Sequence, residues 1–363
     1  MTPRLLLLPT ATLLVGSALA ADRIRLTDGK AIENVQVVSE GLKDVAYKQG
    51  KDDRTVPADS VEAVEYDKTP PQLGEAEAFL LQDDPESAID TLDAFVQTAL
   101  DKPQTVRDFK WAPAQAAWRA VEVRLAATDF EGAKSAANRV ITSFADTRFV
   151  PLAYLAKAAA EREAGQADQA LKTLGDLSGM ISAQSLSKRW ELEARLATAQ
   201  ADPKVKPSAK RAEYEKVQGE AGAFPSVKAL AQVRIADSYL AEAAASPGGS
   251  KELRAQARSA YEGVLGNDAA SRAAVAAAHA GLGECLFLTG ADADDKEQLK
   301  AGALECLRVA TLYRDQGVTV ARALFFAMRC FDLLPDPRRK AEMKRELLGA
   351  YPATTWATEA KKY

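Results

Sequence analysis

Residues 281–312 read GLGECLFLTGADADDKEQLKAGALECLRVATL, and this stretch decides the fold. Apolar residues recur every three or four positions on both sides of the polar segment 291–296, which is typical of two helices joined by a turn. In the second half, Ala303 is followed four residues later by Leu307 and three residues after that by Ala310. These offsets keep the three side chains on one helix face, so the stretch predicts a packed helical hairpin.

The same spacing of one small and two further residues returns along the chain. It occurs in four more places: Ala88, Leu92, Phe95; Ala133, Ala137, Val140; Ala170, Leu174, Leu177; and Ala257, Tyr261, Val264. A small residue lets two helices approach closely where they cross, and the other two extend the stripe toward the next hairpin. The repetition predicts an all-helical array. An ordinary alanine-rich helical bundle with chance spacing is the alternative.

A second feature repeats between the hairpins. Phe144, Thr147, Phe149 and Ala153 match Tyr351, Thr354, Trp356 and Ala360 at identical spacing, and Phe224-Pro225-Ser226 is a looser copy. Together with Leu282-Gly283 and the turn residue Gly290, these patterns resemble the tetratricopeptide repeat, although the units are about 40 residues long instead of 34. Exported bacterial proteins similar to this family often show such lengthened units.

The resemblance covers roughly residues 72–363 and implies a right-handed α-solenoid of about six to seven TPR-like helical hairpins. It is weakest in the fourth unit, where Lys210 occupies the small position. In the last unit Lys340 and Lys344 precede Leu347, which suits a terminal hairpin whose outer face must be polar.

Residues 21–68 follow a different period. Ile24 and Leu26 alternate with arginines, Asp28-Gly29 is a hairpin signal, and short apolar alternations continue to Tyr66. Four or five short strands predict a small SH3/Sm-like β barrel, which we call the β module. The segment Thr69-Pro70-Pro71 stiffens the exit from this module and predicts a boundary before the array at 72–363.

The first 20 residues predict a secretory signal peptide. Arg4 supplies the positive start, Leu5 to Val15 form a short apolar core, and Ala18-Leu19-Ala20 is a small-x-small cleavage site. A membrane anchor is the alternative, but its apolar core would need about 20 residues. We expect a soluble mature chain that begins at Ala21 and is periplasmic or secreted. No other stretch is expected to span a membrane.

Composition limits the classes of function. The 363 residues are 47% hydrophobic and 27% charged with a net charge of -4, which excludes disorder and argues against a general nucleic-acid binder. The three cysteines, an odd number, stand in apolar helical runs. We interpret Cys285, Cys306 and Cys330 as small packing residues; one disulfide plus a free thiol is the alternative.

No residue is assigned to catalysis, to a cofactor or to a metal. His279 is the only histidine, and without a second ligand or an orienting acid it is interpreted as a packing or groove-lining residue. Asp83-Asp84 and Asp294-Asp295 are interpreted as helix N-caps, and the run from Asp292 to Asp295 as a solvated turn without the calcium-loop pattern. The four tryptophans could pack or form ligand platforms.

These observations predict a non-enzymatic scaffold of the bacterial cell envelope, which binds a protein or peptide partner in the concave groove of the array. No nucleic acid and no cofactor is expected as a partner. Two alternatives remain: a cell-wall hydrolase or other envelope enzyme with its site between the β module and the array, and a structural component that assembles with copies of itself.

Overall fold

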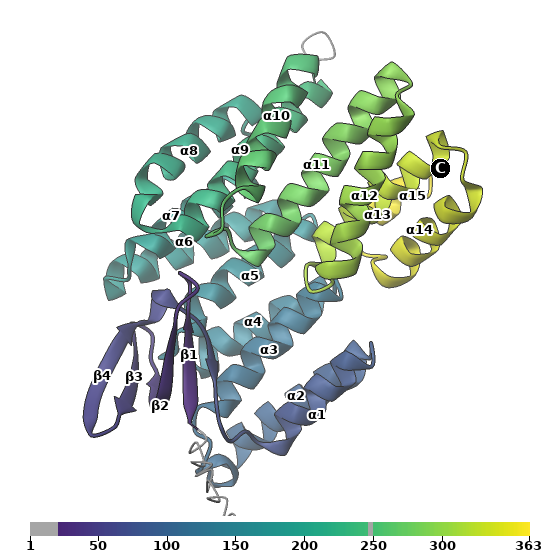
Figure 1. Cartoon of the computed structure of the whole chain (residues 1–363). Coiled ribbons are helices and arrows are strands. Elements are labelled where there is room, and N and C mark those ends of the chain that lie inside the picture. Colours follow the sequence, from purple (N-terminus) through teal and green to yellow (C-terminus); the bar gives the residue numbers. More distant parts are fainter. Residues whose placement is uncertain (1–20, 246–249) are drawn as a thin grey trace, which may run out of the picture.

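The computed structural model describes residues 21–245 and 250–363, so the predicted signal peptide at 1–20 lies outside the described residues. Over these two ranges the chain forms five β-strands followed by fifteen α-helices. In Figure 1 the sheet lies against one side of the helical array, near α3 to α7, and the array continues to the C-terminus.

The β module is one antiparallel sheet with the strand order β4-β3-β2-β1-β5. Its strands are β1 (Asp22–Leu26), β2 (Ala31–Glu40), β3 (Asp44–Gln49), β4 (Asp52–Pro57) and β5 (Val61–Glu65). The alternating apolar side chains pack into a small core that contains Ile24, Val45 and Val64. The short 3-10 helix η1 (Ala58–Ser60) carries the chain from β4 to β5. Within the described residues no ladder joins these two strands, so the barrel is open along that edge.

The helices form seven successive hairpins and one short final helix in the described part of the chain. The pairs are α1 (Pro71–Leu81) and α2 (Pro85–Asp101), α3 (Ala112–Ala126) and α4 (Phe130–Ser143), α5 (Phe149–Glu163) and α6 (Ala167–Gln184), α7 (Lys188–Ala201) and α8 (Pro207–Glu220), α9 (Pro225–Ala245) and α10 (Ser250–Leu265), α11 (Arg272–Ala293) and α12 (Lys296–Leu312), and α13 (Gly317–Leu333) and α14 (Pro337–Ala350), followed by α15 (Thr355–Ala360). Each helix packs on the next, and from α3 to α13 each first helix also contacts the following first helix, so the array is an α-solenoid.

The repeated stripe is the packing face of the second helices. All its residues are buried except Leu307, which is partly buried. The two segments between units that match in sequence also match in conformation, since Phe144 and Tyr351 end their helices with φ,ψ of -130°,42° and -128°,42°. Thr147 and Thr354 each donate a hydroxyl hydrogen bond of 2.8 Å to the carbonyl of that residue. The sequence spacing therefore predicts both the buried stripe and the conformation of the segments between units.

The array closes on itself after one turn. Gly317, the first residue of α13, lies so close to the carbonyl group of Ala126 at the end of α3 that no Cβ would fit between them. Next to it, Val318 packs against Phe130 and Ala160 of the second and third hairpins. We call this contact the seam. The seam turns the open concave array expected from the sequence into a closed one.

The β module is joined to the array by a buried ion pair. Nε of Arg148 donates to Oε2 of Glu40 at 2.6 Å, and the two side chains are 5% and 4% exposed. The hydroxyl of Tyr66 donates to the other carboxylate oxygen at 2.8 Å, and its ring stacks on Trp111 with centroids 3.5 Å apart. The module keeps its own apolar core, but polar and aromatic contacts fix its position on the helices.

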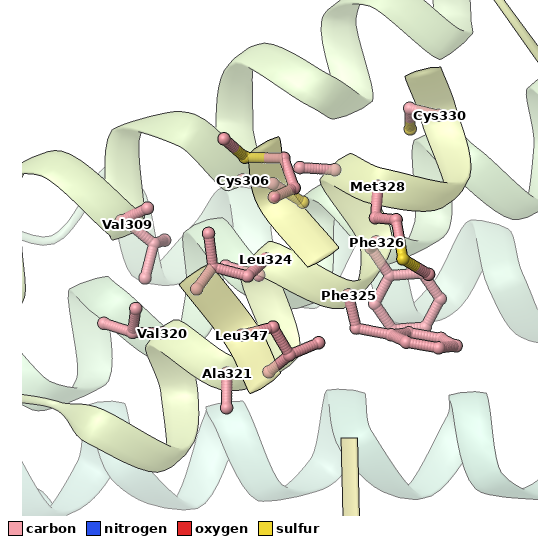
Figure 2. Packing of buried hydrophobic residues seen from close by; sticks show 14 of the residues in the cluster. Cys306, Val309, Val320, Ala321, Leu324, Phe325, Phe326, Met328, Cys330 and Leu347 are labelled. Atoms are coloured by element: carbon pink, nitrogen blue, oxygen red, sulfur yellow. The ribbon is translucent and has the colours of Figure 1, made fainter. Parts of the chain in front are cut away.

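We expected no stretch beyond the signal peptide to be long and apolar enough to span a membrane. By the criteria of length and composition alone, helix α11 contradicts this expectation. Helix α11 has 22 residues and a mean hydropathy of 1.3, because it is rich in alanine and leucine. However, 67% of its apolar window is buried between neighbouring helices. Figure 2 shows the apolar core formed by the helices that come after α11 in the chain, where Leu324 of α13 faces Leu347 of α14. The helix is a core element of the array.

Candidate ligand-binding cavity

A cavity of about 750 Å³ lies between the β module and the first helices of the array. Strand β5 forms one wall, helices α1, α3, α5 and α7 form another, and the loop before α11 closes a third side. Trp118, Phe149 and Trp190 supply aromatic surface. The cavity lies between the β module and the array, which is where the alternative envelope enzyme was expected to have its site, and first helices of the array form part of its wall.

A second cavity of about 880 Å³ lies at the seam. Its walls come from α3 and α5 on one side and from the start of α13 and the end of α14 on the other. Three residues of α3 line both cavities: Trp118, Arg119 and Glu122. We call these three residues the junction, because they line both cavities.

At the junction one cation lies between two anions. Arg119 donates to both carboxylate oxygens of Glu77, at 2.7 and 3.0 Å, and its remaining nitrogen reaches Glu122 at 3.3 Å. Desolvation by the surrounding walls raises the pKa of the Glu122 carboxyl, and the Arg119 guanidinium partly offsets this effect. The three side chains remain 36–53% exposed to the cavities. The Glu122 carboxylate therefore lines both cavities with its charge only partly compensated, by a 3.3 Å contact to a guanidinium that Glu77 shares.

Acidic residues outnumber basic ones in the walls of the two cavities. Ten carboxylates and six arginines line them, and no lysine is among the described lining residues. Each arginine is within 4 Å of a carboxylate: Arg119 of Glu77, Arg148 of Glu40, Arg162 of Glu163, Arg189 of Glu193, Arg272 of Asp315 and Arg314 of Asp83. By contrast, Glu62, Asp268 and Glu346 form no ion pair with any described residue.

A polar cluster holds the later first helices together. Arg322 of α13 donates to Asp237 of α9 at 2.9 Å and to Glu284 of α11 at 2.8 Å, and Tyr261 donates to Asp237 at 2.7 Å. Burial acts to raise the pKa of the Asp237 carboxyl, but the charge of Arg322 outweighs it and holds this pKa below its usual value. These groups satisfy one another, so we interpret the cluster as a brace between hairpins.

His279 does not lie in the walls of either cavity. Its Nδ1 is 2.6 Å from Oε2 of Glu305 on the paired helix, and the residue is 9% exposed. The sequence interpretation did not identify this acid, because Glu305 is 26 residues from His279 along the chain and is brought close only by the pairing of α11 and α12. Arg308 also donates to Glu305 at 2.9 Å, so Glu305 contacts both His279 of α11 and Arg308 of its own helix α12.

The other singled-out residues have structural positions. Asp84 and Asp295 accept hydrogen bonds from backbone amides in the first turns of α2 and α12, as predicted for N-caps, whereas Asp83 and Asp294 do not cap a helix N-terminus and have φ of 62° and 52° in the preceding turns. Cys285, Cys306 and Cys330 are buried in the apolar core. In residues 21–245 and 250–363, no three His, Cys, Asp or Glu side chains are grouped to hold a metal ion.

The tryptophans divide between two roles. Trp111 stacks on the β module and Trp356 packs on Phe325 and Phe326, whereas Trp118 and Trp190 line the first cavity. Sequence reasoning missed Glu77, Arg119 and Glu122. The available signal was their position on α1 and α3, the first helices that are expected to face the inside of the array.

No family model matches the chain, and no curated protein matches it. Among solved structures, the chain is similar to a tetratricopeptide repeat protein from Parabacteroides merdae ATCC 43184. That similarity has a TM-score of 0.42 and 10% sequence identity, and covers 80% of this chain and 96% of that chain.

Proposed function

We propose that this protein is a non-enzymatic interaction scaffold that holds an extended segment of a partner protein in the joined cavities. The observation that supports the proposal is the junction: the same face of α3 lines both cavities, so one ligand can contact the β module and the seam together. An extended chain advances about 3.3 Å per residue, so a short peptide suffices to pass from one cavity to the other.

The polar groups in the cavities suit binding better than turnover. Glu77 is held bidentately by Arg119, and the other lining arginines are likewise in ion pairs. A general acid–base pair needs carboxyl groups that are free to exchange protons with a substrate. The paired groups, Glu77 and Arg119 among them, therefore suit binding better than turnover, whereas Glu62, Asp268 and Glu346 in the same walls form no ion pair with a described residue.

The chain offers a matched pair of variants for testing the proposal. A side chain at Gly74 in the wall of the first cavity, or at Gly175 on the outer helix α6, would meet no atom within 4 Å at its Cβ. Gly74→Trp should block the cavity without a steric clash at the backbone, and Gly175→Trp should add the same bulk outside it.

The measurement is recovery of partners from the organism's envelope extract by the mature chain. The wild type and Gly175→Trp should recover the same partner, and Gly74→Trp should lose it while keeping its helical circular dichroism. Equal recovery by all three proteins would contradict the proposal.

We also propose that the scaffold acts in the bacterial envelope, on the basis of the signal-like residues 1–20. Mass spectrometry of the exported protein should then find an N-terminus at Ala21. An intact Met1 on membrane-bound protein would reject export with cleavage.

A further inference from the structure

We infer that the bound segment is cationic, and that it places a lysine or arginine side chain against Glu122 and Trp118 at the junction. This inference rests on the proposed function, because it names the chemistry of the segment that the cavities hold. Three features of the walls support it: their net charge, the local ion pairing at Glu122, and the adjacent indole ring.

The first support is the charge of the walls as a whole. The six lining arginines all have carboxylate partners, so they offer little attraction to an acidic ligand. Glu62 and Asp268 in the first cavity and Glu346 in the second lack any described partner. Walls with an excess of one sign concentrate the opposite charge, so both cavities favour a positively charged segment.

The second support is the pairing at the junction. Arg119 donates to Glu77 from two nitrogens, Nε and Nη2, at 2.7 and 3.0 Å. Its third nitrogen, Nη1, makes a longer contact of 3.3 Å with Glu122. Two carboxylates thus share one guanidinium, and the group carries a net charge of about -1 at neutral pH. An ammonium or guanidinium from a ligand would complete the coordination of Glu122 through charge-assisted hydrogen bonds.

The third support is Trp118, which precedes Arg119 on α3 and lines both cavities. Its ring is stacked on Phe149 with centroids 6.2 Å apart, which fixes its orientation from one side. An indole next to a carboxylate suits a cation with an alkyl stem, because the ring attracts the charge and packs the methylene groups.

The test uses three synthetic peptides of equal length: alternating lysine and alanine, alternating glutamate and alanine, and alternating serine and alanine. Binding to the mature chain is measured by calorimetry. Glu122→Gln removes the charge at the junction, and Glu297→Gln removes a charge from an outer site that is 83% exposed. The two variants have the same net charge, so general attraction of a basic peptide to an acidic protein affects both equally.

We expect the lysine peptide to bind at one site and to bind Glu122→Gln about tenfold more weakly, with Glu297→Gln unchanged. Equal binding by the wild type and both variants would overturn the inference, because the attraction would then be general. Tighter binding of the serine or glutamate peptide would also overturn it, but would leave the proposed function intact. If none of the peptides binds at millimolar concentration, the proposed function fails as well.

Discussion

Replacing Arg148 by methionine should release the β module from the array. The methionine side chain fills most of the space of the arginine stem, so little cavity is created, but Glu40 keeps its charge in a site where it is 4% exposed. Only the hydroxyl of Tyr66, at 2.8 Å, would still donate to it. Removing one partner of such a buried pair costs about 3–5 kcal/mol.

The assay is urea denaturation followed by two probes. Circular dichroism at 222 nm reports the helices, and tryptophan fluorescence includes Trp111, which stacks on Tyr66 of the module. The two transitions should coincide in the wild type and separate in Arg148→Met, because the module has its own small core.

The control is the double variant Glu40→Leu/Arg148→Met, in which no charge is left buried. It should recover most of the loss and lie within about 1–2 kcal/mol of the wild type, because the other missing contacts are neutral-partner hydrogen bonds, from Tyr66 to Glu40 and from Arg148 to the carbonyl of Val61. Equal losses in the single and the double variant, or a loss below about 1 kcal/mol in the single variant, would refute this account of the interface.

Three further predictions concern other parts of the chain. Gly317→Val should open the seam at Ala126, with a larger radius of gyration in small-angle scattering and a stability loss of about 1–3 kcal/mol, whereas Gly349→Val, which has open space, should leave the radius unchanged. The hydrogen bond from His279 lowers the pKa of Glu305; burial opposes this effect, and the charge of Arg308 adds to it, so the pKa lies below 4.5. The stabilisation from Glu305 is therefore complete above pH 4.5 and is lost as the pH falls through the lowered pKa. Urea midpoints between pH 6 and pH 3 should therefore fall more steeply for the wild type than for Glu305→Gln, and parallel curves would exclude this pair as a contributor. Burial raises the pKa of Cys285 and Cys330 to about 12, so all three thiols should resist alkylation in the folded chain and react fully in urea without reductant; fewer than three reactive thiols would show a disulfide.

The sequence was sufficient for those parts of the fold that depend on local spacing. The stripe at four and three residues, the aspartate N-caps and the segments after Phe144 and Tyr351 are all set by residues that are close together along the chain. Each of these signals comes from neighbours along the chain, so a single sequence contains it in full.

Contacts between distant residues could not be predicted in the same way. The seam depends on small rotations that accumulate over six hairpins until Gly317 meets Ala126. Glu40 and Arg148 are 108 residues apart, and neither position differs in sequence from an ordinary exposed charged residue. The site depends on both contacts, because the seam and the docked module form the walls around Glu122. For this reason the helical array was predictable, whereas the residues of the candidate site were not.

The central claim is that a partner segment occupies the junction of the two cavities, and photo-crosslinking tests it most directly. A photoreactive phenylalanine analogue would replace Trp118 at the junction or, as the control, Leu304 on the outer helix α12, which is 64% exposed. After irradiation in envelope extract, mass spectrometry should identify one contiguous, lysine- or arginine-containing segment of a single partner joined to position 118 and not to position 304. The same crosslinks at both positions, or crosslinks at position 304 alone, would contradict the claim.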